Sequence, residues 1–161
     1  VMPGKGVLQM TGQMGDVMKE SAQIALTYVR SVASDYGVKE NYFEKHDIHL
    51  HIPEGAVPKD GPSAGITMSV AILSAVSKIP VRAKIAMTGE VTLRGRVLPI
   101  GGLKEKLLAA KQYGIDKVLV PDADRADVEE LDAEITDGME LVYVKNMKQV
   151  ADEALLWKEA L

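Results

Sequence analysis

Apolar residues recur at three- and four-residue steps from Met14 to Val32, which is the spacing of an amphipathic helix. We expect this helix to end near Gly37, because glycine readily takes the left-handed conformation that terminates helices. Polar and apolar residues alternate over residues 47–52, and this period of two predicts a strand. A shorter strand-like run covers residues 7–10. The first third of the chain therefore predicts one long helix between two strands.

The rest of the chain also contains segments with helical spacing and segments with the alternation of strands. Three prolines, two glycines and an aspartate mark a loop over residues 53–62. Strands over residues 84–88 and 91–98 are expected to form a hairpin around Gly89 and Glu90. The other expected elements are helices over residues 62–77, 103–113 and 125–131 and from Asn146 onward, and strands over residues 118–120 and 141–144. This mixture predicts the α/β (α+β) class, as one compact domain over residues 1–161 with a mixed sheet and flanking helices.

The composition narrows the possible classes of function. Of the 161 residues 47% are hydrophobic, which is enough for one buried core, and there is no cysteine for disulfide or thiol chemistry. The net charge is −4 without a basic stripe, so no nucleic-acid partner is expected. No apolar run approaches the roughly 20 residues that a membrane span needs. The start at Val1, without an initiator methionine or an apolar signal segment, predicts a processed or excised fragment.

A candidate nucleophile lies where the predicted loop enters a helix, in Gly61-Pro62-Ser63-Ala64-Gly65. Proline is favourable in a first helical turn, because its missing N–H would have no partner there. This places Ser63 in the first turn, where main-chain N–H groups point outward and the helix dipole is positive. Such a helix end stabilises an oxyanion, which favours Ser63 as a nucleophile. An ordinary helix-start serine is the alternative interpretation.

The same five residues match G-x-S-x-G, the nucleophile elbow of α/β-hydrolases. That motif needs a strand directly before the serine, whereas a proline-containing loop precedes Ser63. It also needs a histidine later in the chain, and the three histidines, His46, His49 and His51, all come earlier. We therefore reject a hydrolase of that type.

A lysine can activate a serine when burial disfavours its charged form and lowers its pKa toward neutrality. The predicted helix that begins at Leu103 has one face made of Leu103, Lys106, Leu107 and Ala110. Lys106 is thus expected among apolar residues, while Lys104 lies on a more mixed side. The helical phase favours Lys106 as the base, with a solvated lysine as the alternative.

Three sequence segments around the candidate serine and lysine follow one another along the chain: residues 58–65 (PKDGPSAG), 87–95 (MTGEVTLRG) and 98–106 (LPIGGLKEK). Together with residues 49–55 (HLHIPEG), they resemble the proteolytic domain of Lon, the ATP-dependent protease family, in its bacterial LonA type. The resemblance covers essentially the whole chain. Its blocks are long and in order, so it is far more specific than a bare G-x-S-x-G.

The resemblance implies a serine endopeptidase with a Ser–Lys dyad. By motif, the family's nucleophile falls on Ser63, its lysine on Lys106, and its lysine-supporting threonine on Thr88, which would hold the amine by a hydrogen bond. Neutral Lys106 would take the Ser63 proton, and an acyl-enzyme would form and be hydrolysed. The substrate peptide is expected to lie extended along a strand edge. Residues expected to flank the site or gate its loop are His51, Asp60, Gly61, Pro62 and Ala64.

The resemblance also implies partners. The sequence has no G-x-x-x-x-G-K-[ST] phosphate loop, so no cofactor and no metal are expected in this domain, and ATP and magnesium would belong to an AAA+ module of the full-length protein. We expect a homo-hexamer formed through like domains, and unfolded or misfolded polypeptides as substrates. The location is expected to be the bacterial cytoplasm, with no membrane contact. The domain alone is expected to cut only unfolded chains or peptides, without ATP.

Other interpretations of the sequence stay open. His49 or His51 would be the base in a histidine-dependent hydrolase, or the two would form part of a metal site that lacks a convincing third ligand. A catalytically silent, ring-forming domain is a third class. The seven carboxylates of residues 122–134 are interpreted as a solvated helix face.

Overall fold

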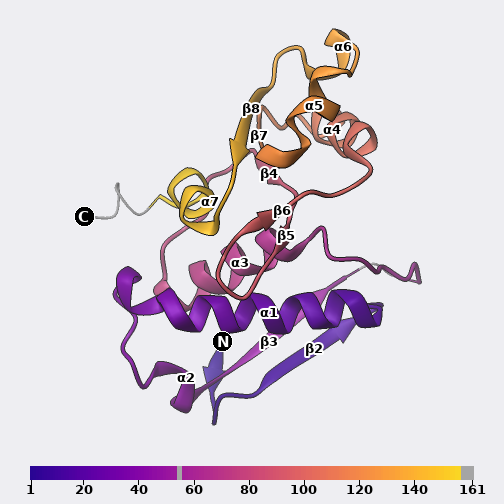
Figure 1. The fold of residues 1–161 in the computed structure, drawn as a ribbon. Helices are drawn as coiled ribbons and strands as arrows, with labels where there is room; N and C mark the ends of the chain where they lie inside the picture. Colours follow the sequence, from indigo (N-terminus) through magenta and orange to yellow (C-terminus); the bar gives the residue numbers. More distant parts are fainter. Residues whose placement is uncertain (54–55, 157–161) are drawn as a thin grey trace.

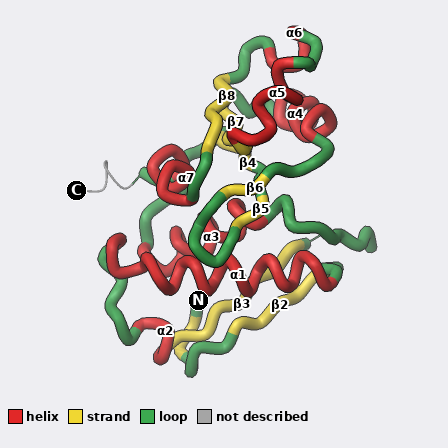
Figure 2. The backbone as a smooth tube through the Cα atoms, viewed as in Figure 1, coloured by secondary structure: helices red, strands yellow, loops and turns green. Residues whose placement is uncertain are grey.

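A computed structural model describes residues 1–53 and 56–156 of the chain. Glu54 and Gly55, which fall in the predicted loop 53–62, and residues 157–161 lie outside the described part. The lower half of the molecule in Figure 1 is a sheet crossed by one long helix, and the upper half is a second sheet with helices on both sides. A central helix and a short hairpin lie between the halves (Figures 1 and 2).

The lower sheet has the strand order β1-β3-β2 and is mixed, because β1 is antiparallel to β3 while β2 is parallel to it. The long helix α1 covers this sheet with its apolar stripe, and it ends in a 3₁₀ turn at Gly37, whose φ of 79° is left-handed. The bounds are β1 Met2–Pro3, β2 Leu8–Gly12, β3 His46–Ile52, α1 Asp16–Val32, η1 Ala33–Tyr36 and α2 Tyr42–Lys45.

The upper sheet has the order β4-β7-β8 and is parallel throughout. Successive residues of its central strand enter different hydrophobic clusters: Leu119 packs with the α1 and α3 side, whereas Val118 and Val120 pack with α4 and its neighbours. A parallel sheet buried on both faces explains the continuous apolar run of this strand. The bounds are β4 Ile85–Met87, β7 Lys117–Pro121, β8 Glu140–Val144, α4 Leu103–Gln112, η2 Asp122–Asp124, α5 Arg125–Glu129, α6 Ala133–Thr136 and α7 Met147–Ala154.

The central helix α3 (Gly65–Ser77) is apolar on nearly all sides because it is packed against both halves. It crosses α1 closely at its first residue. An added Cβ on Gly65 would lie 2.9 Å from the main-chain nitrogen of Val91 and 3.0 Å from the Ser21 hydroxyl. This close crossing sets where the chain before α3, which carries Ser63, enters the fold.

The predicted hairpin around Gly89 and Glu90 is wrong. β4 pairs with β7 instead, and the hairpin is formed by β5 (Glu90–Val91) and β6 (Val97–Leu98). The reversal takes place farther along, where the Thr92 and Arg96 main chains bond across a turn that Gly95 closes with a φ of 81°. The apolar pattern of residues 91–98 did not distinguish one continuous strand from two short strands joined by a turn.

The predicted α/β class, with a mixed sheet and flanking helices, is confirmed. The elements that the sequence patterns missed are β1, α2, α6 and the two 3₁₀ turns, all of four residues or fewer. Segments of this length are too short to show a period. Within residues 1–53 and 56–156, no helix is both long enough and apolar enough to cross a membrane.

Replacing Gly65 by alanine tests the close crossing of α1 and α3. The new methyl group would press on the Val91 backbone, which cannot rotate away as a side chain can. We expect a loss of about 1–3 kcal/mol in the free energy of unfolding, measured by urea denaturation.

Gly101→Ala is the matched control, because an added Cβ there meets no atom within 4 Å and the residue has no positive φ. It should change stability by about 0.5 kcal/mol or less. Equal stabilities for the two variants would contradict the packing described.

Candidate active site

Asp60 ties the loop before Ser63 to the start of α1. Its Oδ1 accepts hydrogen bonds from the main-chain N–H groups of Met18 (2.9 Å) and Gly61 (2.8 Å). The N-cap residue of α1 is Gly15, which has no side chain to fill that role, so Asp60 caps the helix from a distant part of the chain. These bonds, that from Met18 foremost, lower the pKa of Asp60.

Ser63 lies in the turn immediately before α3, with Ala64 as the N-cap, so the expected placement inside the first helical turn is wrong. The main chain is bent here because the Gly65 N–H bonds to the Pro62 carbonyl, 3.1 Å away. The next amide, that of Ile66, bonds to the Gly89 carbonyl at 3.1 Å. The first amides of the helix are therefore already paired. The main-chain N–H groups of Ser63 and Ala64 have no hydrogen-bond partner within the described part of the chain.

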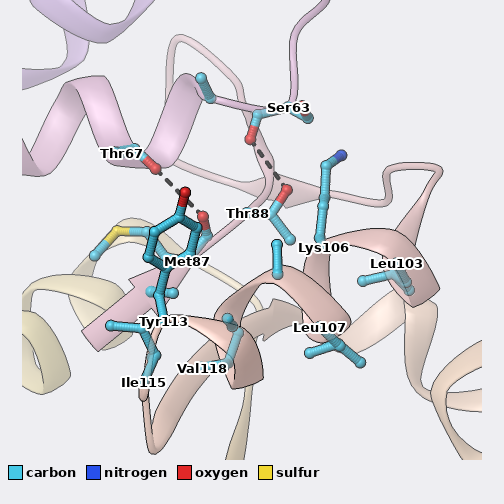
Figure 3. Close-up of a pocket in the computed structure, with 14 residues that line it drawn as sticks. Ser63, Thr67, Met87, Thr88, Leu103, Lys106, Leu107, Tyr113, Ile115 and Val118 are labelled. Atoms are coloured by element: carbon cyan, nitrogen blue, oxygen red, sulfur yellow. Dashed lines mark hydrogen bonds between the residues drawn. The ribbon is translucent and has the colours of Figure 1, made fainter. Parts of the chain in front are cut away.

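Thr88 is buried, at 6% exposed, and its hydroxyl bonds to Ser63. Its hydroxyl donates a 3.3 Å hydrogen bond to the Ser63 carbonyl, and the neighbouring Gly89 N–H donates to the same oxygen at 2.9 Å (Figure 3). The expected bond from Thr88 to the lysine amine is thus not what the structure shows. Since Thr88 directly follows β4, the edge of the sheet holds the serine's backbone in place.

Lys106 projects from α4 toward the loop of Ser63 (Figure 3). Leu103, Leu107 and Ala110 are buried as the helical phase predicts, but Lys106 itself is exposed. At 100° per residue it falls at the border of the apolar stripe, so its stem packs while its amine reaches the surface. The amine donates a 2.9 Å hydrogen bond to the Gly101 carbonyl.

Partial burial lowers the pKa of Lys106 below the ordinary value for lysine, against the opposing effect of two carboxylates, those of Asp124 and Glu105. A lowered pKa increases the fraction of neutral amine near neutral pH, and only the neutral amine accepts a proton. The bond to Gly101 uses an N–H and leaves the nitrogen lone pair available.

Ser63, Thr88 and Lys106 line one cavity of about 470 Å³, which we call the Ser63 cavity. Its walls are otherwise mostly apolar and come from α3, β4, α4 and β7 (Figure 3); they include Ala64, Met87, Leu107, Tyr113, Ile115 and Val118. Ser63 and Lys106 also share a second cavity of about 520 Å³ with Pro62, Pro99, Ile100 and Gly101. The fold therefore brings a serine and a lysine, 43 positions apart in sequence, to the wall of one mostly apolar cavity.

The histidines are placed elsewhere. His49 and His51 project from the exposed face of β3, where the Thr11 hydroxyl bonds to both rings, at 2.8 Å and 2.7 Å. Neither ring lines a cavity that contains Ser63. The described residues also contain no group of three or more metal-ligating side chains that could hold a metal ion. Asp60 and Gly61 do not line the Ser63 cavity either, whereas Ala64 lines it and Pro62 lines the second cavity.

Sequence reasoning missed Asp124. It belongs to the run interpreted as a solvated helix face, yet it is 3% exposed, and its Oδ2 accepts a 2.9 Å hydrogen bond from the Ile100 N–H. Its position just before α5 is typical of a capping aspartate, but the side chain makes no capping bond there, so no local signal indicated its bond to Ile100. Tyr113 and Thr67 were missed as well, because nothing in the local pattern shows that they face the Ser63 cavity.

Comparison with known proteins identifies one family. The family profile of the Lon protease (S16) C-terminal proteolytic domain matches residues 1–157. The Lon protease of Lachnoclostridium phytofermentans is 64% identical over 155 residues, which cover 96% of this chain and 19% of that protein. The Lon protease of Heliobacterium modesticaldum is 57% identical, with the same coverage, and that of Syntrophomonas wolfei is 55% identical over 161 residues, 100% of this chain and 20% of its own.

The class of protein that these matches define is the proteolytic domain of a protease. The chain belongs to the Lon protease (S16) family and corresponds to its C-terminal proteolytic domain. It spans about a fifth of the length of the curated relatives it matches.

The role of Asp60 as a remote cap is tested by Asp60→Ala and Asp60→Asn. Alanine removes the acceptor for the Met18 and Gly61 amides, so the loop before Ser63 should loosen and peptide cleavage should fall by roughly 10-fold or more. Asparagine keeps an acceptor oxygen and should retain most activity.

Glu20→Ala, an exposed change on α1, is the matched control for melting temperature and cleavage rate. If Asp60→Ala behaves like Glu20→Ala in both measurements, Asp60 does not hold the loop.

Proposed function

We propose that this domain is a serine endopeptidase in which Ser63 is the nucleophile and Lys106 its general base. The observation that carries the proposal is that Ser63 and Lys106, whose amine has a pKa lowered by partial burial, line the same mostly apolar cavity. A base with a lowered pKa beside a serine is the arrangement that nucleophilic catalysis requires. The family membership favours the same reaction.

In the proposed reaction, the neutral amine of Lys106 takes the hydroxyl proton while Ser63 Oγ bonds to the peptide carbonyl carbon. The amides of Ser63 and Ala64, which lie at the entry to α3, stabilise the oxyanion. The peptide C–N bond then breaks, and Lys106 returns the proton to the departing amine. Water, deprotonated by Lys106, hydrolyses the ester and restores the Ser63 hydroxyl.

Thr88 acts on the nucleophile rather than on the amine in this proposal. By holding the Ser63 carbonyl together with the Gly89 amide, it keeps the serine backbone at the edge of the cavity. Asp60 holds the other end of the same loop against α1. The loop is thereby anchored on both sides of Gly61, whose φ of 114° allows the chain to turn between the anchors.

For the full-length protein, we propose an assembly in which an AAA+ module supplies unfolded polypeptides at the expense of ATP and magnesium, with like domains arranged as a homo-hexamer in the bacterial cytoplasm. The Lon protease names of relatives about five times longer than this chain support a larger protein around it. The domain itself is proposed to cleave only unfolded chains or peptides, without ATP.

The central test is ATP-free cleavage of a permanently unfolded, fluorescently labelled polypeptide by this chain. Ser63→Ala should lose roughly 10³-fold or more of the rate, because the nucleophile is gone, and Lys106→Ala should lose a similar amount. Lys104→Ala, two residues away and exposed on the same helix, is the matched control and should keep the wild-type rate.

Two outcomes would overturn the proposal. Survival of cleavage in Lys106→Ala together with its loss in His51→Ala would establish a histidine base. A wild-type chain that neither cleaves nor is labelled at Ser63 by a peptide boronate would be a catalytically silent domain.

A further inference from the structure

Residues 99–102 (PIGG), which we call the Gly101 loop, connect strand β6 to helix α4. The first of them, Pro99, has no main-chain N–H to donate. Pro99, Gly101 and Gly102 are exposed, so they have few side-chain contacts that would hold the loop. The conformation of this loop therefore depends on how its remaining residue, Ile100, is bound to the rest of the fold.

One hydrogen bond ties the Gly101 loop to a distant part of the chain. The Ile100 N–H donates to Oδ2 of Asp124 at 2.9 Å. Among the described residues, no other hydrogen bond leads from residues 99–102 to an element other than α4. The Ile100 side chain also packs against the hydrophobic cluster formed by α4, α5 and β7. Ile100 is thus the residue at which the loop is anchored.

Asp124, the acceptor of this bond, is the last residue of η2, which directly follows the central strand β7. It is also the N-cap residue of α5, but its side chain makes no capping bond there. The residue is 3% exposed, and burying a carboxylate is costly unless a hydrogen-bond donor compensates for the lost water. The carboxylate therefore serves the Gly101 loop rather than its own helix, with the Ile100 N–H as the compensating donor.

The amine of Lys106 depends on the same loop. It donates a 2.9 Å hydrogen bond to the Gly101 carbonyl, and this is its one hydrogen bond among the described residues. The helix that carries Lys106 also begins on the loop, because the Lys106 N–H bonds to the carbonyl of Gly102, the N-cap residue of α4. The two residues that directly follow Ile100 thus set both the direction of the amine and the start of its helix.

We propose that Asp124 is a positioning residue: by holding the Ile100 N–H it fixes the Gly101 carbonyl, and through that carbonyl it orients the Lys106 amine toward Ser63. This inference rests on the proposed function, in which Lys106 is the base. Asp124 lines neither of the two cavities that contain Ser63. Its effect on the reaction is therefore transmitted through the Gly101 loop, without contact with a reacting atom.

Orientation matters because a neutral amine has a single lone pair, which must face the Ser63 hydroxyl to accept its proton. The lysine side chain is long and flexible, so an amine without a fixed acceptor has many directions open to it. A bond from one N–H to the Gly101 carbonyl removes most of them and leaves the lone pair free. A displacement of about 1 Å costs up to roughly 100-fold in rate, so a small shift of the loop is enough to impair the base.

The second cavity connects the Gly101 loop with the nucleophile as well. Its walls come from the loop of Ser63 and from three residues of the Gly101 loop, and Lys106 lines it too. Thr88 and Gly89 hold the Ser63 backbone independently, from the end of β4. Loss of the Asp124 anchor should therefore move the base relative to a serine that stays in place.

The charge of Asp124 also acts on the amine, and a pH profile separates this effect from positioning. Burial lowers the pKa of Lys106, while the carboxylates of Asp124 on η2 and Glu105 on α4 raise it. The other titratable side chain in the two cavities that Lys106 lines is Tyr113. Cleavage requires the neutral amine, so it should rise with pH through the pKa of Lys106. Removing the Asp124 charge lowers that pKa and moves the midpoint to lower pH.

The experiment measures kcat–pH profiles for cleavage of the unfolded polypeptide. Asp124→Asn keeps an oxygen that accepts the Ile100 N–H, so it should retain the wild-type plateau at high pH and lower only the midpoint. Asp124→Ala loses both acceptor and charge, so its plateau should fall roughly 10- to 100-fold with KM unchanged. Equal plateaus for the two variants, or an Asp124→Asn midpoint that does not move, would overturn the role of Asp124.

Asp122→Asn is the matched control, because Asp122 lies in the same short helix but faces outward. Its side chain is 30% exposed and pairs with Arg125 at 2.9 Å and with Lys145 at 3.8 Å. Exposed ion pairs contribute little to stability, so this variant should match the wild type in plateau and midpoint. A plateau as low as that of Asp124→Ala would mean that any change in η2 has the same effect, and would overturn the assignment.

The donor can be removed as well, which keeps the test decisive if Asp124→Ala does not fold. Replacing Ile100 by the α-hydroxy acid with the same side chain turns its N–H into an ester oxygen and leaves every side chain in place. The ester chain should lose plateau rate as Asp124→Ala does. Combining the two changes should add little, because both remove the same hydrogen bond. A wild-type plateau in the ester chain, or losses that multiply, would overturn the proposal.

NMR of Lys106 distinguishes failure of this inference from failure of the proposed function. In a lysine of fixed orientation the two protons on Cε have different chemical shifts, whereas free rotation makes them coincide. With lysines isotopically labelled at Cε, and Lys106→Arg for assignment, the two signals should stay separate in Asp124→Asn and merge in Asp124→Ala. If this pattern appears but Lys106→Ala still cleaves, the positioning is right and the base is wrong. If Lys106 is essential but the signals do not change, the base stands and the positioning role is wrong.

Discussion

The backbone pairing of Ser63 with Gly89 is the interaction on which the site depends. It joins the turn before the central helix α3 to the strand edge of the upper sheet. Thr88 strengthens the same contact, and the Ile66 amide returns a bond to Gly89. Because Ser63 lies in the turn before the central helix and Lys106 lies on α4 of the upper half, this junction sets how the serine is placed relative to the lysine.

The position of Lys106 at the border of an apolar stripe meets two opposing requirements. Complete burial would lower its pKa further but would remove the amine from the cavity surface, and full solvation would leave it protonated near neutral pH. The flanking Leu103 and Leu107 anchor the helix in the core, so the amine is partly desolvated and still reaches Gly101. The carboxylate of Asp124 raises the pKa of Lys106 and so opposes part of the lowering that burial causes.

Two aspartates perform the same physical task on opposite sides of the site. Asp60 holds the Met18 and Gly61 amides, and Asp124 holds the Ile100 amide. Charge-assisted bonds to main-chain N–H groups are stronger than neutral ones, so each carboxylate fixes a loop that lacks regular structure. The loop that carries Ser63 and the loop that accepts a hydrogen bond from the Lys106 amine thus each have a remote anchor.

The amino-acid sequence by itself determined the long elements and the chemical candidates. The period of residues 14–32 and the alternation of residues 47–52 are local properties, and so are the motif blocks around Ser63 and Lys106. Tertiary structure decided which strand pairs with β4, where α3 begins, which oxygen Thr88 contacts, and that Asp124 is buried. These features depend on bonds between residues far apart in the chain, and a local pattern carries no information about such partners.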